Sequence, residues 1–176
     1  GDTIFSVGYA SSSTIYSFSL TSNTASSALF KNSWNTATGS STAMDTTNRI
    51  WAVFSANDGI HFFDTRNGLS NDWYTPTTTG TAPTGAVGMA YDSVNKRFAF
   101  WNGNGKQIWF LTAPSSSPYA GGNAWAWSSN TPGSGSTPDA AQANGTYGRF
   151  AFSSNAAVQG FTLVNSDTGS VYFYKP

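Results

Sequence analysis

Cysteine is absent from this chain of 176 residues, and histidine occurs once, at His61. Without cysteine the chain can form no disulfide bond, no thiolate zinc site and no cysteine nucleophile. A zinc site needs three or four nitrogen, sulfur or oxygen ligands at suitable spacing, and a single histidine does not supply such a set. We therefore expect no metal site and no cofactor.

Charge is scarce and balanced. Charged residues make up 9% of the chain, eight basic against eight acidic, and glutamate is missing altogether. Long solvated helices are usually rich in Glu, Lys, Arg, Ala and Leu, so this composition favours strands joined by turns. Because there is no basic excess, we expect no nucleic-acid partner.

Long apolar runs are also missing. No stretch of about 18 consecutive apolar residues occurs, so we expect neither a membrane-spanning helix nor membrane insertion. Serine, threonine, asparagine and glycine dominate the chain instead. This polar but charge-poor composition favours an extracellular, secreted or particle-surface location.

A hairpin pattern recurs along the chain. Four segments share an apolar strand, a polar turn and a second strand rich in β-branched and aromatic residues. They are IFSVGYASSSTIYSFSL from Ile4, IWAVFSANDGIHFFDTR from Ile50, FAFWNGNGKQIWFLTAP from Phe98 and FTLVNSDTGSVYFYKP from Phe161. Their second strands begin at Ile15, Ile60, Ile108 and Val171. The turns supply Asn, Asp, Ser and Gly, most of which tolerate the positive φ angles that tight hairpins require.

Flanking segments extend the hairpin to a unit of four strands. A short strand precedes it, as in STAMDTTNR, and a Trp-bearing strand follows it, as in NDWYTPTT and NAWAWSSNTP. Four-stranded units that repeat roughly every 45 to 50 residues are typical of β-propeller blades. We predict an all-β, β-propeller-like array of about four antiparallel four-stranded blades. The units span approximately residues 1–40, 41–86, 87–140 and 141–176, and a lectin-like β-sandwich is the alternative fold.

Two stretches carry a resemblance to a known family. MAYDSVNKRFAFWNGNGKQIWFL, followed by AWAWSSNTP, resembles a Kelch repeat of the galactose-oxidase-type propellers. NGTYGRFAF, followed by GFTLVNSDTGSVYFY, is similar to the last blade of bacterial proteins of that kind. The resemblance is best over residues 44–176, and it departs from the family where Asn102-Gly103-Asn104-Gly105 replaces the usual double glycine. It implies a propeller fold, but the copper chemistry of galactose oxidase needs a cysteine that this chain lacks.

The first and last units of this array are incomplete. The first unit supplies the second, third and outer strands of a blade, and the last unit supplies the inner three. One interpretation is a small four-bladed ring with imperfect closure. The other, which we favour, is part of a larger ring that self-association or a missing segment completes, because exposed blade faces and strand edges promote aggregation.

Catalytic chemistry finds little support in the sequence. His61 lies three residues before Asp64, but no nucleophile elbow or oxyanion motif accompanies them. Asp45 and Asp92 occupy the same position in successive repeats, which indicates a role in turns because a catalytic residue is needed only once per site. We therefore assign no catalytic residue.

The aromatic residues are the most suggestive feature, with seven Trp, eight Tyr and thirteen Phe in the chain. Sugar rings stack on aromatic faces while Asn, Asp and Ser bind their hydroxyl groups, so aromatic residues in polar loops suit glycan binding. The candidate ligand-binding residues are Trp73, Tyr74, Tyr119, Trp125, Trp127, Asn102 and Asn104. The competing interpretation is that the Trp residues of AWAW simply pack an outer strand on the next blade.

Three functions are compatible with this pattern. The favoured hypothesis is a non-enzymatic recognition module at the cell exterior or a particle surface that binds carbohydrate through aromatic and Asn-rich loops. The second is a structural or assembly protein of a surface, appendage or phage that associates with itself. The third is a glycan hydrolase or lyase built on a propeller, which would need two nearby carboxylates.

Overall fold

The computed structural model of the chain describes residues 3–7, 14–29, 40–66, 73–119, 123–139, 146, 149–165 and 168–176. Within these ranges the fold is all-β, with strands joined by turns, as the sequence predicts. The strands form four separate sheets that follow one another along the chain. No helix in the described ranges is long and apolar enough to span a membrane.

The first two sheets are built from consecutive antiparallel strands. The first contains β1 (Thr3–Val7), β2 (Thr14–Ser19) and β3 (Thr24–Leu29), paired in that order. The second contains β4 (Ser41–Asp45), β5 (Ile50–Ser55), β6 (Gly59–Asp64) and β7 (Trp73–Tyr74), also paired in chain order.

The last two sheets repeat this plan. The third contains β9 (Gly88–Asp92), β10 (Arg97–Trp101), β11 (Ile108–Thr112) and β12 (Trp125–Asn130), and the fourth contains β13 (Phe150–Ser153), β14 (Gly160–Val164) and β15 (Val171–Tyr174). Strand β8 (Thr78–Thr79), which was not predicted, pairs in parallel with β12 and makes the third sheet five-stranded.

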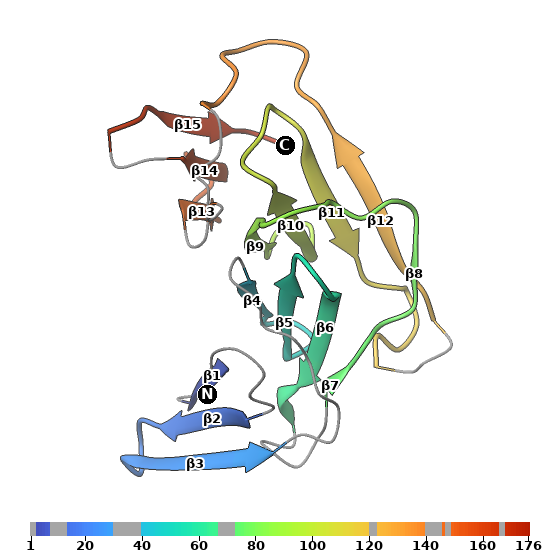
Figure 1. The fold of residues 1–176 in the computed structure, drawn as a ribbon, viewed down its shortest axis with the longest axis vertical. Helices are drawn as coiled ribbons and strands as arrows, with labels where there is room; N and C mark the ends of the chain where they lie inside the picture. The colour runs from blue at the N-terminus through green and yellow to red at the C-terminus, as the bar shows by residue number, and fades with distance from the viewer. Residues whose placement is uncertain are drawn as a thin grey trace.

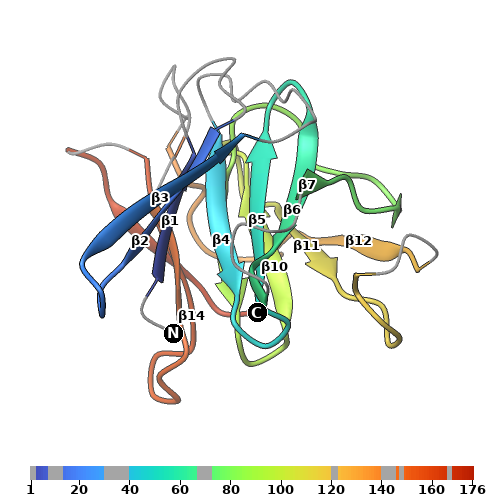
Figure 2. The same ribbon diagram turned by 90° about the horizontal axis from the view of Figure 1, so that it is seen from below.

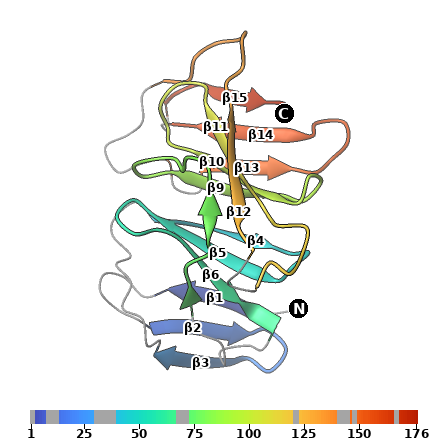
Figure 3. The same cartoon turned by 90° about the vertical axis from the view of Figure 1, so that its right-hand side faces the viewer.

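The four sheets are arranged along an arc (Figure 1). Strands β4, β9 and β13 lie on its inner side, where β9 contacts both β4 and β13, while β7 and β12 lie on its outer side. Seen from below, the second sheet runs from β4 at one edge to β7 at the other (Figure 2). Viewed from the side, the sheets are stacked in chain order, the arrangement of a propeller-like array with three-stranded sheets at both ends (Figure 3).

The pairing register shows which positions are equivalent in the four sheets. Within the hairpins, Ile4 pairs with Phe18, Trp51 with Phe63, Phe98 with Leu111 and Phe161 with Tyr174. The aligned starts Ile4, Phe98 and Phe161 are therefore equivalent, but Ile50 is offset by one residue and Trp51 takes its place. The second-strand starts Ile15, Ile60 and Val171 agree with this register. They pair with Val7, Phe54 and Val164, each three residues after Ile4, Trp51 and Phe161.

Hydrophobic clusters lie between neighbouring sheets. Alternate residues of β5 and β6 pack on β10 and β12, so that Phe62 contacts Phe98 and Trp125 with ring centroids 5.7 and 4.6 Å apart. The other face of the third sheet packs on the fourth, where the ring centroids of Phe110 and Phe161 lie 6.2 Å apart. A buried Phe side chain contributes about 1.5–3 kcal/mol of hydrophobic stabilisation, so the sheets are held chiefly by one another.

Aspartates shape the turns at the start of the two middle hairpins. Asp92 Oδ1 accepts hydrogen bonds from the backbone N–H groups of Val94 and Asn95 at 3.2 and 3.0 Å, and Asn95 Nδ2 donates to Asp92 Oδ2 at 2.8 Å. Asp45 makes the same three contacts in the second sheet. The turn role predicted for both aspartates is confirmed.

Candidate functional site

Three of the predicted ligand-binding residues are tryptophans in outer strands, and all three are buried. Trp73 of β7 packs on Trp51 and Phe63, with ring centroids 5.3 and 5.4 Å away. Trp125 and Trp127 of β12 face the cluster between the second and third sheets. These indole rings offer almost no surface to a ligand. Trp125 and Trp127 pack an outer strand on a neighbouring sheet, as in the competing interpretation of the AWAW segment, but that neighbour is the preceding sheet and not the next one.

The two predicted tyrosines, Tyr74 and Tyr119, form part of a contact between sheets. Tyr119 donates its phenolic hydrogen to the carbonyl oxygen of Asn48 in the second sheet, and the Arg66 guanidinium lies 3.4 Å from the centre of the Tyr119 ring. Tyr74 donates to the carbonyl oxygen of Pro118 at 3.4 Å. Their polar atoms are thus engaged in holding the loop around Pro118 against the second sheet.

Burial dominates the electrostatics of this contact. It raises the pKa of Tyr74 and of Tyr91, whose hydroxyl lies 3.3 Å from Thr47 Oγ1, well above the ordinary value for tyrosine. Hydrogen bonds from the Arg66 side chain lower the pKa of Asp64, and Arg66 Nη2 lies 2.6 Å from the carboxylate. The phenols stay neutral and the carboxylate stays ionised near neutral pH, as suits structural groups.

The predicted asparagines lie in the tight turn between β10 and β11. Asn102 Oδ1 accepts a hydrogen bond from the backbone N–H of Asn104 at 3.1 Å, which accounts for the turn. Asn165 Nδ2, from the fourth sheet, donates to the Gly103 carbonyl at 3.0 Å. Asn104 itself is exposed. Tyr74 and Tyr119 lie at the contact with the second sheet, whereas this turn contacts Asn165 of the fourth, so the structure does not bring the predicted residues into one site.

His61 lies half-buried on β6, and burial lowers its pKa. Its Nδ1 lies 3.3 Å from Thr75 Oγ1, while the carboxylate of Asp64 is bound by Arg66 instead. Among the residues that the structure describes, no group of three or more His, Asp or Glu side chains is placed to hold a metal ion.

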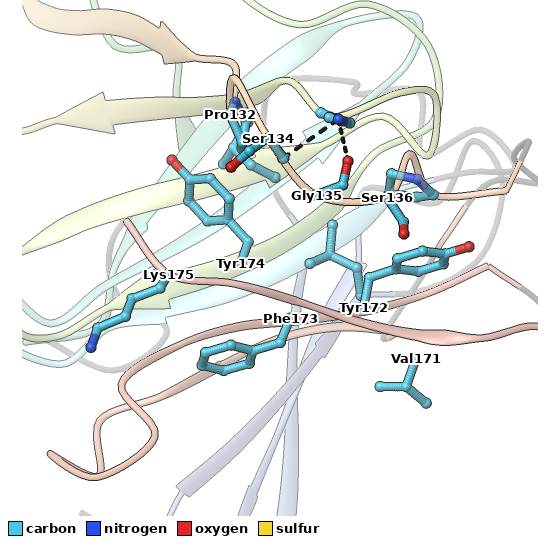
Figure 4. A pocket seen from close by; sticks show the side chains of 13 residues that line it. Pro132, Ser134, Gly135, Ser136, Val171, Tyr172, Phe173, Tyr174 and Lys175 are labelled. Atoms are coloured by element: carbon cyan, nitrogen blue, oxygen red, sulfur yellow. Dashed lines mark hydrogen bonds between the residues drawn. The ribbon is translucent and has the colours of Figure 1, made fainter.

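A groove lies between the third and fourth sheets in the described part of the chain. Its volume is about 330 Å³. One wall is β15, from which Tyr172 and Tyr174 project, and the opposite wall is the loop through Pro132, Gly135 and Ser136 (Figure 4). A volume of this size lies at the lower end of the range for small-molecule sites.

Polar groups surround the aromatic rings of the groove. Lys106 Nζ donates hydrogen bonds to the backbone carbonyls of Ser134 and Gly135, which fixes the loop over the groove. The hydroxyl of Tyr174 accepts a hydrogen bond from Asn130 Nδ2 at 2.8 Å. Tyr172 is only partly buried. The groove therefore combines a partly exposed tyrosine with hydroxyl groups, carbonyl groups and an ammonium group.

The position of the groove follows from the strand count. In the second and third sheets the strand after the hairpin, β7 or β12, covers the outer edge of β6 or β11. Among the described residues no strand covers the outer edge of β15. The space beside β15 therefore stays open, and the loop through residues 131–139 encloses it from the other side.

The groove residues were missed by the sequence analysis, and only a weak signal pointed to them. Val171 to Tyr174 is a run of β-branched and aromatic residues typical of a strand, and the 131–139 loop has no pattern beyond its Ser, Gly and Pro content. Lys106 follows an Asn-Gly turn that resembles many hairpins. Only the arrangement of two sheets brings these residues together.

Neither a scan against models of known protein families nor a search of curated proteins finds a match for this chain. The resemblance to Kelch repeats of galactose-oxidase-type propellers therefore stays a prediction from the sequence.

Proposed function

We propose that this protein is a non-enzymatic recognition module that binds a saccharide in the groove between its third and fourth sheets. The observation that carries the proposal is the lining of that groove. A partly exposed tyrosine lies beside serine hydroxyls, backbone carbonyls and the Lys106 ammonium group in a space of about 330 Å³.

The chemistry of the groove matches the chemistry of a neutral sugar. A pyranose presents C–H groups on its faces and hydroxyl groups around its edge. The Tyr172 ring suits the first, while Ser134 and Ser136 suit the second, as donors and acceptors that fix orientation. The location outside the cell or on a particle surface, proposed from the composition, would expose the groove to glycans.

Glycan-array binding followed by calorimetry tests this proposal. We expect the intact protein to bind one or a few neutral saccharides, and Tyr172→Ala to weaken that binding about tenfold or more because the stacking surface is lost. Val94→Ala is the control, since Val94 is an exposed apolar residue in a turn of the third sheet and does not line the groove.

Three results would contradict the saccharide site. A blank array at millimolar glycan concentration would reject saccharide as the ligand. Binding that survives Tyr172→Ala, or that falls equally with Val94→Ala, would leave the groove without this role.

A further inference from the structure

The two ends of the array carry exposed apolar side chains. On the last sheet, Val171 and Phe173 of β15 are 67% and 53% exposed. On the first sheet, Tyr16 and Phe18 of β2 are 49% and 36% exposed. In both strands the residues alternate, so each pair lies on one face of its sheet. Apolar side chains gathered on one face commonly mark an interaction surface.

The strand pairing shows that the uncovered face of the last sheet corresponds to the face that, in the second and third sheets, packs on the following sheet. Phe173 pairs with Thr162 as Phe110 pairs with Ala99 and Phe62 with Ala52. Phe62 and Phe110 are buried, because each faces the following sheet. Phe173 occupies the same position in the fourth sheet, but no sheet formed by the described residues covers it.

The uncovered face of the first sheet corresponds to the face that, in the third and fourth sheets, packs on the preceding sheet. Phe18 pairs with Ile4 as Leu111 pairs with Phe98 and Tyr174 with Phe161. Leu111 and Tyr174 are buried, because each faces the preceding sheet. Phe18 occupies the same position but has no preceding sheet among the described residues.

We infer that the face around Phe173 and the face around Phe18 bind each other between two copies of this chain. Each internal interface joins a face like that around Phe173 to a face like that around Phe18, and the described residues leave one face of each kind uncovered. Strands β2 and β15 contain no charged residue, so their contact buries no unpaired charge. A second copy therefore supplies the complementary surface, and the array continues across the junction.

This contact is heterologous: the two faces that meet are different. Such contacts close into rings when the rotation between copies allows it and otherwise extend into filaments. All four residues of β15 line the groove, but the side chains of Tyr172 and Tyr174 project towards the loop through Gly135, whereas those of Val171 and Phe173 project from the other side of the strand (Figure 4). The inference therefore rests on other side chains than the saccharide site.

Sedimentation velocity with two single variants tests the inference. We expect the unmodified chain at tens of micromolar to sediment as a dimer or larger ring. We expect Phe173→Ser or Phe18→Ser alone to sediment mainly as monomer, with association weakened about tenfold or more by the lost Phe burial. Val94→Ser is the matched control, because Val94 is an exposed apolar residue in a turn away from both faces.

Mixing the two variants separates this contact from any symmetrical one. The Phe173→Ser chain keeps the face around Phe18, and the Phe18→Ser chain keeps the face around Phe173. A mixture can therefore form one junction, between the two different variants. An equimolar mixture should therefore form a heterodimer and nothing larger. Thermal unfolding of each variant, unchanged within a few degrees, shows that the exposed substitutions leave the fold intact.

Three results would overturn the inference. A monomeric unmodified chain at this concentration would show that no copy covers the end faces. Association of either variant alone, as strong as that of the unmodified chain, would show that the assembly uses another surface. Equal dissociation by Val94→Ser would show that the effect is not specific to these faces.

Discussion

At the scale of single residues, two aspartates determine how the middle sheets begin. Asp45 and Asp92 are buried, and each binds two backbone N–H groups and the side-chain amide of an asparagine three residues later. The residue after that asparagine, Arg49 or Lys96, has a positive φ of 56° or 53°. The carboxylate thus stabilises a turn whose backbone is costly for a residue other than glycine.

Replacing Asp92 with alanine should destabilise the protein by about 1–3 kcal/mol. The change leaves the N–H groups of Val94 and Asn95 without their acceptor and removes the Arg97 contact at 3.1 Å. Urea denaturation followed by tryptophan fluorescence measures the loss. Ser93→Ala in the same turn is the control, and a loss as large as that of Asp92→Ala would contradict this role for the carboxylate.

The raised pKa values of two partly buried tyrosines predict that the protein loses stability at alkaline pH. The folded-state pKa values of Tyr74 and Tyr91 are raised above the value of about 10 for tyrosine in an unfolded chain. Their contribution is therefore fully present below pH of about 10 and is lost as the pH rises from there towards the folded-state pKa. The free energy of unfolding should therefore fall as the pH rises above about 10, and it should fall less steeply in Tyr91→Phe than in the unmodified chain. Equal slopes of this free energy against pH in the two proteins would contradict the prediction.

At the scale of elements, β8 shows how the chain crosses between sheets. It runs parallel to β12, and the backbone N–H of Trp125 donates to the Thr77 carbonyl at 2.9 Å. Gly80 follows with a φ of +82°, and a Cβ atom there would lie 2.5 Å from the Trp127 carbonyl oxygen. The crossing segment can approach β12 this closely only because residue 80 has no side chain.

Gly80→Ala should therefore destabilise the protein more than Gly85→Ala. Both glycines have a φ near +80°, so each substitution incurs a backbone penalty of roughly 1–2 kcal/mol. Only residue 80 adds a clash, since a Cβ at Gly85 meets nothing within 4 Å. Parallel thermal melts of the two variants check this, and equal shifts in Tm would show that β8 does not pack on β12 as described.

How far the sequence predicts the elements depends on how local the signal is. The hairpins follow from turn residues and alternation, so β5, β6, β10 and β11 were placed to within a residue or two. The one-residue misalignment of Ile50 arose because Trp51 and Ile50 are both apolar, and only the pairing register distinguishes them. Strand β8 has two threonines and no apolar alternation, so nothing local predicted it.

The candidate site was harder to predict because it depends on non-local packing. Trp125 and Trp127 lie near polar loops in sequence, and only the neighbouring sheet reveals that they are buried. Conversely, Tyr172 resembles a core residue in sequence but lines an open groove, because no described strand covers β15.

At the scale of the whole molecule, stability comes from sheets packed face to face. The third sheet buries one face on the second and the other on the fourth, through two separate clusters. A small sheet that packs on no neighbour is marginal in water, so the order of sheets and their mutual contact are the central features of this fold.

Aromatic contacts between rings of neighbouring sheets, measured by nuclear Overhauser spectroscopy on selectively labelled protein, test that order most directly. The fold predicts cross-peaks from Phe62 to Trp125 and from Phe54 to Phe100, whose ring centroids lie 4.6 and 5.6 Å apart, and from Phe110 to Phe161 at 6.2 Å. Cross-peaks from Phe62 to Phe161, with those three absent, would place the second sheet directly on the fourth and contradict the array.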